Sequence, residues 1–442
     1  MKPRDPGHYT IKTTSSTVAP TGVEVIPSKG GYWQGARTLY MKNASNITIK
    51  NIEFRGGSSP ILACIEAPSS NITIDSCIIG RCSKGGIIAG TFANNADVVQ
   101  NLKITNSVID KGWTLAENNI KDNLILQCDG IAFHNGVNAG AIRGNIIRNF
   151  GHEAIGLFDH SGYASSYGVK NVIVEMNDVA AGNSAYMHAF SIISTAGKAM
   201  YNIVKRNYFH HFQSGCTIGG EVNFVFANIF STITASPILQ HKQSPWGGNV
   251  ATWDFESRQL VSKNNWIVNN TFYMTDAYSI LLARSTTDTT SLWGNKIMNN
   301  VFMNFGRDTT YPSDSGVPPP RVGLRIENNV PAGQTLIHKN NFWDRDDTTA
   351  TKQVAKYRNS FYTATGLNLC AECGGGNVTG NMQLNPRFDS FFGLTPYSSP
   401  TLQTGGFKYS TNIIAWGLNP TEYVDYFGTP WPTDLSIGAV QY

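Results

Sequence analysis

The sequence predicts an all-β chain wound into a single-stranded, right-handed parallel β-helix, a solenoid of about ten or more coils. Three observations predict this fold: the composition, a recurring phrase, and the spacing of that phrase. Charged residues make up only 14% of the 442 residues and hydrophobic residues 41%, whereas roughly 25% of a typical globular domain is charged. Long stretches with a 3.6-residue apolar period are missing from the sequence, so helices should be few and short.

The recurring phrase consists of alternating apolar residues, an Asn, and an Ile, Val or Phe two places later. Examples are NITIKNIEF (46–54), NLKITNSVI (101–109) and NKIMNNVFMNF (295–305). The central Asn or its equivalent marks one turn of the chain, at Asn51, Asp75, Asn106, Asn145, Asn177, Asn207, Asn228, Asn270, Asn300 and Asn341. The intervals between these markers run from 21 to 42 residues, which is typical of a solenoid whose loops absorb insertions.

Each apolar stretch alternates with period 2, so each repeat is a turn of strands that pairs in parallel with the next. Inward residues such as Ile47, Ile49, Ile52 and Phe54 are expected to bury against the coils above and below. The marker Asn has a structural role in this scheme. Its amide can bond the Asn of the next coil, and Asn tolerates left-handed backbone angles.

The chain divides into an N-terminal segment that forms a first coil or cap (1–40), parallel β-helix coils (41–345), and C-terminal coils with a capping segment (346–442). No stretch of about 18 apolar residues predicts a membrane span, and the first residues lack the apolar core of a signal peptide. The net charge of +4 comes without runs of Lys or Arg, which argues against a nucleic-acid partner. Cys370 and Cys373 are expected to form a local bridge or to stay as two free thiols, not to bind metal.

These coils resemble the pectate-lyase-like right-handed β-helix superfamily. The segment NPRFDSFFGLTPYSSPTLQTGG and the final DLSIGAVQY are similar to the closing segment of bacterial β-helix repeat proteins, where a last strand ends the helix. The resemblance covers residues 40 to 442 and implies a polysaccharide partner and a secreted, cell-surface or periplasmic location. Because the superfamily includes lyases, hydrolases, epimerases and adhesins, it fixes no activity.

A second strand follows each Asn turn, as in GIAFHN (130–135), AIGLFDH (154–160), PILQHKQ (237–243) and SILLARS (279–285). Four residues after the first apolar position the aligned strands carry Thr91, Asn135, Asp159, Ser194, Gly220, Lys242 and Arg284. These side chains are expected to leave the core at the strand end and to stack in one surface column. Asp129 and Glu153 begin their strands and are expected to lie away from that column.

β-Elimination of a uronate needs a base, a donor or cation for the enolate-like charge, and a proton source. In the predicted register Lys242 and Arg284 lie on neighbouring coils, about 5 Å apart at the backbone. The strand ends ILQHKQ and ILLARS resemble those of alginate lyases and chondroitinases of this fold. That resemblance implies Lys242 as base and Arg284 as acid or charge stabiliser. From the residues alone, His134, His160 and His241 are further candidates for the donor or the base. The expected activity is therefore cleavage of an acidic polysaccharide by a lyase.

No cofactor is assigned by the sequence. The lyase families place acidic calcium ligands on the lysine-bearing strand, but SPILQHKQ (236–243) contains no carboxylate. Glu221, one coil earlier, would bind an ion alone only poorly. Calcium stays an open alternative.

Two other functions stay open. Asp159 and Glu221, two coils and about 9 to 10 Å apart, match the carboxylate separation of an inverting glycoside hydrolase. The second open function is glycan binding without catalysis, as in an adhesin or a phage-type fibre, because tryptophans in the long insertion after residue 242 can stack on sugar rings. The expected substrate-binding residues are His134, Asn135, His160, Trp246 and Trp253.

Overall fold

The computed structural model describes residues 2–3, 10–13, 23–24, 37–55, 61–80, 85–91, 97–110, 129–150, 153–159, 167–180, 188–194, 198–212, 214–233, 248–253, 261–275, 278–283, 292–305, 322–327, 330, 332–374, 377–388, 398, 402–403, 406, 425–429 and 437–440. The chain forms two compact units. Unit 1 comprises Met1–Ile203 and His210–Glu221, and unit 2 comprises Val204–Phe209 and Val222–Tyr442. In both units the strands belong to three sheets, which we name A, B and C.

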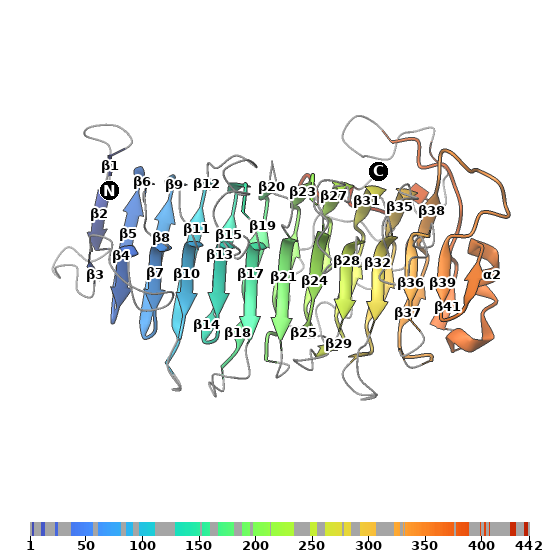
Figure 1. Cartoon of the computed structure of the whole chain (residues 1–442), viewed down its shortest axis with the longest axis horizontal. Coiled ribbons are helices and arrows are strands. Elements are labelled where there is room, and N and C mark those ends of the chain that lie inside the picture. The colour runs from blue at the N-terminus through green and yellow to red at the C-terminus, as the bar shows by residue number, and fades with distance from the viewer. Residues whose placement is uncertain are drawn as a thin grey trace, which may run out of the picture. The chain divides into compact units, whose positions relative to one another are not determined.

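In unit 1 the strands lie side by side in chain order within each sheet (Figure 1). Sheet A contains β1 (Lys2–Pro3), β6 (Ile52–Arg55), β9 (Ile78–Gly80), β12 (Val108–Asp110), β16 (Ile146–Arg148) and β20 (Asp178–Ala180). Sheet B contains β2 (Thr10–Thr13), β5 (Ser45–Lys50), β8 (Ser69–Asp75), β11 (Val99–Thr105), β15 (Ala141–Arg143) and β19 (Ile173–Glu175), with β14 (Val137–Asn138) and β18 (Val169–Lys170) beside them. Sheet C contains β3 (Val23–Glu24), β4 (Arg37–Lys42), β7 (Ile61–Glu66), β10 (Gly85–Gly90), β13 (Asp129–His134), β17 (Glu153–Asp159), β21 (His188–Ser194) and β24 (Ser214–Ile218). The short β25 (Gly220–Glu221) follows, and β22 (Ile203–Lys205) and β23 (Tyr208–His210) contribute residues to both units.

Unit 2 repeats this plan. Its part of sheet A contains β27 (Ile229–Ile233), β31 (Thr271–Thr275), β35 (Val301–Phe305) and β38 (Asn341–Trp343). Its part of sheet B contains β26 (Phe224–Phe226), β30 (Trp266–Val268), β34 (Lys296–Met298), β37 (Leu336–His338) and β41 (Val378–Thr379), and β29 (Ser262–Lys263) pairs with β33 (Leu292–Trp293). Its part of sheet C contains β28 (Gly248–Trp253), β32 (Tyr278–Ala283), β36 (Leu324–Ile326), β39 (Ala355–Tyr357) and β40 (Ser360–Tyr362).

The coils stack in parallel register, with equivalent side chains directly above one another. Ile49 of β5 is the Cα partner of Ile74, which partners Ile104, which partners Ile142. All four side chains are fully buried, because every second residue of a strand faces the interior of the coil. Both units are therefore right-handed parallel β-helical stacks, and the predicted fold class is confirmed. The first strands differ, since β1, β2 and β3 pair antiparallel with β6, β5 and β4.

A ladder of buried asparagines runs along the corner between sheets B and A. The Nδ2 group of Asn145 donates to Oδ1 of Asn177 in unit 1. In unit 2 the same bond links Asn207, Asn228, Asn270, Asn300, Asn340 and Asn381 in sequence. The predicted side-chain bonding between coils is thus confirmed, except that Asn340 and not Asn341 belongs to the ladder. Asp75 and Asn106 also stand outside it, because Ser107 Oγ accepts from the Cys77 amide in their place.

The left-handed backbone angle belongs to the residue just before each ladder position. Met176, Ala227, Asn269 and Lys339 have φ values of 54°, 53°, 52° and 51°. The chain turns sharply at this residue, and the following Asn then points into the core. The sequence predicted that one Asn both bonds to the next coil and adopts the left-handed backbone angle. In the structure the ladder Asn makes the bond, and the residue before it adopts the angle.

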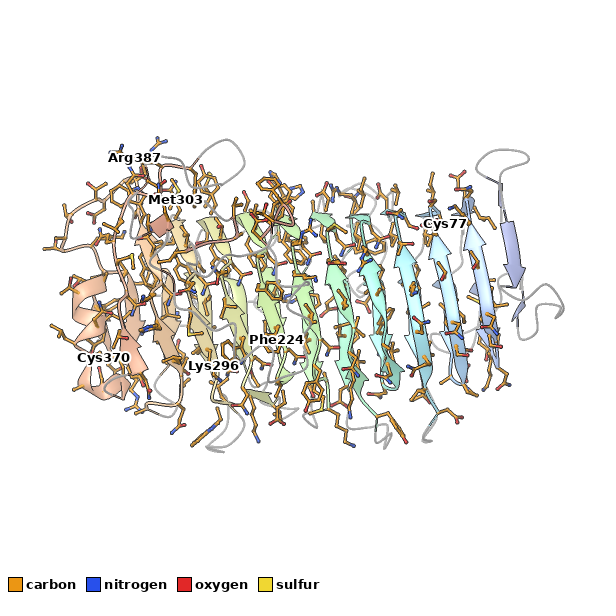
Figure 2. The ribbon with its side chains drawn as sticks, turned by 180° about the vertical axis from the view of Figure 1, so that it is seen from behind. Cys77, Phe224, Lys296, Met303, Cys370 and Arg387 are labelled. Atoms are coloured by element: carbon orange, nitrogen blue, oxygen red, sulfur yellow. A yellow bond between two sulfur atoms is a disulfide. The ribbon has the colours of Figure 1, made fainter. Side chains whose placement is uncertain are left out.

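Aromatic side chains stack inside and outside the coils of unit 2. Inside, Phe rings of sheet A form a column with centroid spacings of 4.6 to 5.1 Å, made of Phe209, Phe230, Phe272, Phe302 and Phe342. On the outer face of sheet B, Phe224 stacks on Trp266, and Lys296 Nζ lies 4.8 Å from the Trp266 ring (Figure 2). Burial lowers the pKa of Lys296.

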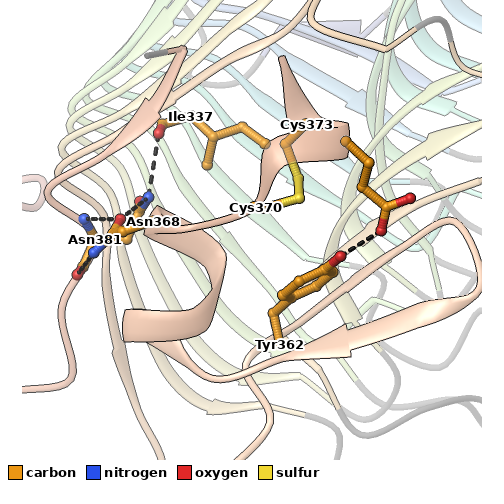
Figure 3. Close-up of a disulfide and its surroundings, with 7 residues drawn as sticks. Ile337, Tyr362, Asn368, Cys370, Cys373 and Asn381 are labelled. Carbon is orange, nitrogen blue, oxygen red and sulfur yellow. Dashed lines mark hydrogen bonds between the residues drawn. A yellow bond between two sulfur atoms is a disulfide. The ribbon is translucent and has the colours of Figure 1, made fainter. Parts of the chain in front are cut away.

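The C-terminal part ends the ladder with a helix. Asn368 of α2 (Ala364–Asn368) offers its Oδ1 to the backbone N–H and Nδ2 of Asn381, as the next coil would (Figure 3). A disulfide joins Cys370 and Cys373 around η2 (Ala371–Cys373), which confirms the expected local bridge. No described helix is long and apolar enough to cross a membrane.

The described residues of the closing segment do not form the expected last strand. Residues 437–440 instead lie against sheet A of unit 2, where the Gly438 N–H donates to the Asn299 carbonyl and the Ala439 N–H to Thr271 Oγ1. Ile437 packs with Val301 and Leu402. The apolar residues of this segment therefore cover several coils from outside and do not add a further coil.

Candidate functional site

A polar cluster occupies the outer face of sheet C in unit 1. We call it the sheet C cluster and define it as Asp129, His134, Glu153, His188 and Ser191. Strand alternation places His134 and Ser191 on the face opposite the core residues Ile131, Ile155 and Phe190. The cluster lies on β13, β17 and β21, three consecutive coils.

Two carboxylates and a histidine form one column at the strand starts. Glu153 is the Cα partner of His188, and the Glu153 N–H donates to Asp129 Oδ1 over 3.2 Å. The column exists because the inward and outward alternation breaks at the start of β10 and β13, although their register is constant. A Cβ on Gly130 would meet the core residues Ile147 and Phe150, so the position directly before Ile131 also faces inward. Asp129 precedes it, and its Cα partner Gly85 faces Ile88 of the outer face.

Four members of the cluster are buried although they lie outside the coil, and His188 is partly exposed. Asp129 is 6% exposed and Glu153 is 2% exposed. Ser191 is also buried, and its Oγ has no hydrogen-bond partner among the residues that the structure describes. Buried ionisable and hydroxyl groups are costly to retain, so their convergence on one face marks this face for a role other than packing.

An apolar floor supports the cluster. Cys64, Ile88, Ala132 and Phe158 pack together on the same outer face. The Phe158 ring covers Gly156, because a Cβ there would lie 2.2 Å from the ring. The His134 ring lies 4.9 Å from the Phe158 ring. Rigid aromatic contacts of this kind fix the orientation of the His134 imidazole.

The expected surface column at the strand ends exists as a column but is not on the surface. Asp159 partners Ser194, and the Thr91 N–H donates to the Asn135 carbonyl, as the predicted register requires. All four side chains are buried, however. Asp159 Oδ2 accepts from Ser194 Oγ at 2.8 Å and from the Lys198 N–H at 2.9 Å. Asp159 follows the alternation of the core residues Ile155 and Leu157, so it faces inward and its carboxylate binds the turn that contains Lys198.

Glu221 does not share the Asp159 column. It lies in β25, and its neighbour on the preceding coil is Met200. Met200 in turn neighbours Lys170, so this row follows the corner that leads into sheet B. The paired hydrolase carboxylates expected from Asp159 and Glu221 are therefore not formed by these residues.

The strand pairing predicted to bring Lys242 and Arg284 together differs from the pairing in the structure. The two strands beside β32 are β28 and β36, so Gly248–Trp253 takes the place that the sequence suggested for 237–243. The backbone of Trp253 partners Ala283. His160, His241, Lys242, Trp246 and Arg284 themselves lie outside the described residues, as does the Trp253 side chain.

No group of three or more His, Cys, Asp or Glu side chains that could hold a metal ion occurs among the described residues. Sequence reasoning noted Asp129 and Glu153 but set them aside, and it missed His188. The available signal was an acidic residue or histidine directly before each apolar run, in CDGIAFH, HEAIGLF and HAFSII.

No family model and no curated protein matches this chain. Solved structures similar to it include a DFA-IIIase from Arthrobacter chlorophenolicus, at 14% identity and a TM-score of 0.36 over 59% of this chain and 54% of that one. A mannuronan C-5 epimerase A-module from Azotobacter vinelandii shares 11% identity, with a TM-score of 0.42 over 79% and 77%. A tailspike protein of an E. coli bacteriophage shares 12%, with a TM-score of 0.43 over 72% and 56%. The chain spans little more than half the length of the DFA-IIIase and the tailspike.

Proposed function

We propose that this chain is a carbohydrate-active enzyme that cleaves a polysaccharide on the outer face of sheet C, with Asp129 and Glu153 as the reacting carboxylates. The observation that carries the proposal is the position of these two acids on adjacent coils, joined through the Glu153 amide. Two carboxyl groups flanking one bond are the chemical requirement of glycoside hydrolysis. A stack of coils also offers the extended surface that a polymer needs.

The spacing of the coils favours hydrolysis with retention of configuration. Consecutive coils are about 4.8 Å apart, and retaining glycosidases hold their two carboxyl groups about 5 to 5.5 Å apart. One carboxyl group would attack the anomeric carbon while the other protonates the departing oxygen. Water would then release the sugar as the second group takes a proton back. His188, the coil neighbour of Glu153, is positioned to influence the proton held by that carboxyl group.

The test combines two product assays with matched variants. The full chain is incubated with a panel of neutral and acidic glycans, and new reducing ends and the ultraviolet absorbance of unsaturated uronates are both followed. Glu153→Gln and Asp129→Asn should each lower the rate of reducing-end release at least about 100-fold, the usual value of a reacting acid or base. Asp129→Asn keeps an oxygen to accept the Glu153 N–H, so the fold should survive. Glu221→Gln is the control and should keep full activity.

Three outcomes contradict the proposal. Full reducing-end release in both carboxylate variants removes Asp129 and Glu153 from the mechanism. Unsaturated products that disappear only in Lys242→Ala establish β-elimination at the site expected from the sequence. Glycan binding without any product, in the parent and the variants alike, establishes a binding protein.

A further inference from the structure

A second cluster of titratable side chains lies on the outer face of sheet A in unit 1. It consists of Arg148, Asp178, His210 and His211. Asp178 Oδ1 lies 2.7 Å from His210 Nε2, and Asp178 Oδ2 accepts from the Arg148 guanidinium. His210 Nδ1 lies 2.7 Å from His211 Nδ1. The sheet C cluster and the proposed polysaccharide chemistry use none of these groups.

The backbone explains why two consecutive histidines face the same way. Neighbouring residues of a strand normally point to opposite faces. His210 ends β23, and His211 has a φ of 56°, in the left-handed region. The turn at His211 brings its ring beside that of His210, with centroids 5.0 Å apart and planes at 79°. A β-strand continuing past His210 would have separated the rings.

The hydrogen bonds define which ring nitrogens can act as ligands. The Asp178 carboxylate only accepts, so His210 Nε2 carries a hydrogen and His210 Nδ1 has a lone pair. That lone pair points at His211 Nδ1. A carboxylate that holds one nitrogen of a histidine and thereby orients the other is the usual arrangement around metal-bound histidines.

We propose that His210 Nδ1 and His211 Nδ1 together bind a divalent transition-metal ion of the zinc type. Zinc–imidazole bonds of about 2.0 to 2.1 Å at a tetrahedral angle require nitrogens about 3.3 Å apart. The rings must therefore separate by about 0.6 Å from the present contact. The His211 proton moves from Nδ1 to the exposed Nε2, so no proton is lost in binding. With two protein ligands, the remaining positions of the ion are open to water or to a ligand.

The test is calorimetric titration of the full chain with zinc chloride at neutral pH. The parent should bind one equivalent that is absent in both His210→Ala and His211→Ala. Asp178→Asn should bind that equivalent about 10- to 100-fold more weakly, as expected when the orienting carboxylate is removed. His338→Ala changes a histidine of unit 2 that contacts Thr379 and should bind as the parent does.

Circular dichroism and thermal unfolding verify that each variant is folded. Unchanged stoichiometry and affinity in both His210→Ala and His211→Ala would overturn the proposal, and so would a parent that binds no zinc. The pair would then be a proton-sharing contact only. Because glycan cleavage is not measured here, this result is independent of the function proposed for the sheet C cluster.

Discussion

The asparagine ladder offers the sharpest test of how the coils are held together, and Asn270 is one of its best-connected members. Asn270 Nδ2 donates to the Val225 carbonyl, the Val268 carbonyl and Asn300 Oδ1 at 2.9 to 3.1 Å. Its Oδ1 accepts from the backbone N–H and the Nδ2 of Asn228 at 3.1 and 3.0 Å. The side chain is fully buried, so water cannot replace these bonds.

Asn270→Ala should lower the free energy of unfolding by about 3 to 5 kcal/mol. The largest part comes from the Asn228 backbone N–H, which loses its acceptor inside the core at a cost of about 1 to 3 kcal/mol. Asn300 Oδ1 and two carbonyls each lose one donor, at about 0.5 to 1.5 kcal/mol for a typical bond. Asn138→Ala is the matched control. Asn138 also bonds between coils, to Gln100 and Asn171, but it is partly exposed and should cost less than about 1 kcal/mol.

Guanidinium unfolding of the two variants measures the difference, and hydrogen exchange at the Asn228 amide reports it locally. Two compact units need not unfold together, so the amide is the more direct probe. The exchange rate of Asn228 should rise in Asn270→Ala and stay unchanged in Asn138→Ala. Equal costs for the two variants, or a protected Asn228 amide in Asn270→Ala, would refute the idea that buried asparagine bonds stabilise the stack.

Three other predictions concern single side chains. Burial raises the pKa of Asp75, but hydrogen bonds from Asn106, Lys50 and Thr105 outweigh it and lower the pKa below 3.8. The stabilisation is therefore present above about pH 4 and is lost as pH falls through the folded pKa. In urea unfolding, the free energy of unfolding of Asp75→Asn should fall less steeply between about pH 4 and lower pH than that of the parent. Burial raises the pKa of Cys77 to about 11, so iodoacetamide at pH 8 should label it roughly 100-fold more slowly than an exposed thiol. Mass spectrometry follows the labelling, and fast labelling of the folded protein would contradict this prediction. Phe272→Ala opens a gap in the Phe column and should cost about 3 to 5 kcal/mol in chemical unfolding, whereas a cost below about 1 kcal/mol would mean that the stacked rings repack.

The repeat could be predicted because each coil obeys the same local rules. Period-2 apolar runs and a corner Asn recur in the sequence, and the structure stacks Ile49, Ile74 and Ile104 as those runs require. The sequence also predicted the register of the strand ends correctly as far as Ser194. The predicted pairing of 237–243 with the strand that contains Arg284 was wrong. The long insertion there contains several apolar runs, and only pairing with β32 decides which one joins the sheet.

The amino-acid sequence by itself determined the parallel coils and the asparagine bonds between them, because both depend on residues whose spacing repeats. It left Cys370 and Cys373 open between a local bridge and two free thiols, and the structure shows the bridge. Only the tertiary structure decided which polar residues meet. Asp159 faces inward, while Asp129 and Glu153, 24 residues apart, came together on the outer face. Asp159 follows the alternation of Ile155 and Leu157. The outward direction of Asp129 depends on a local break in that alternation at the start of the strand, which no apolar pattern records.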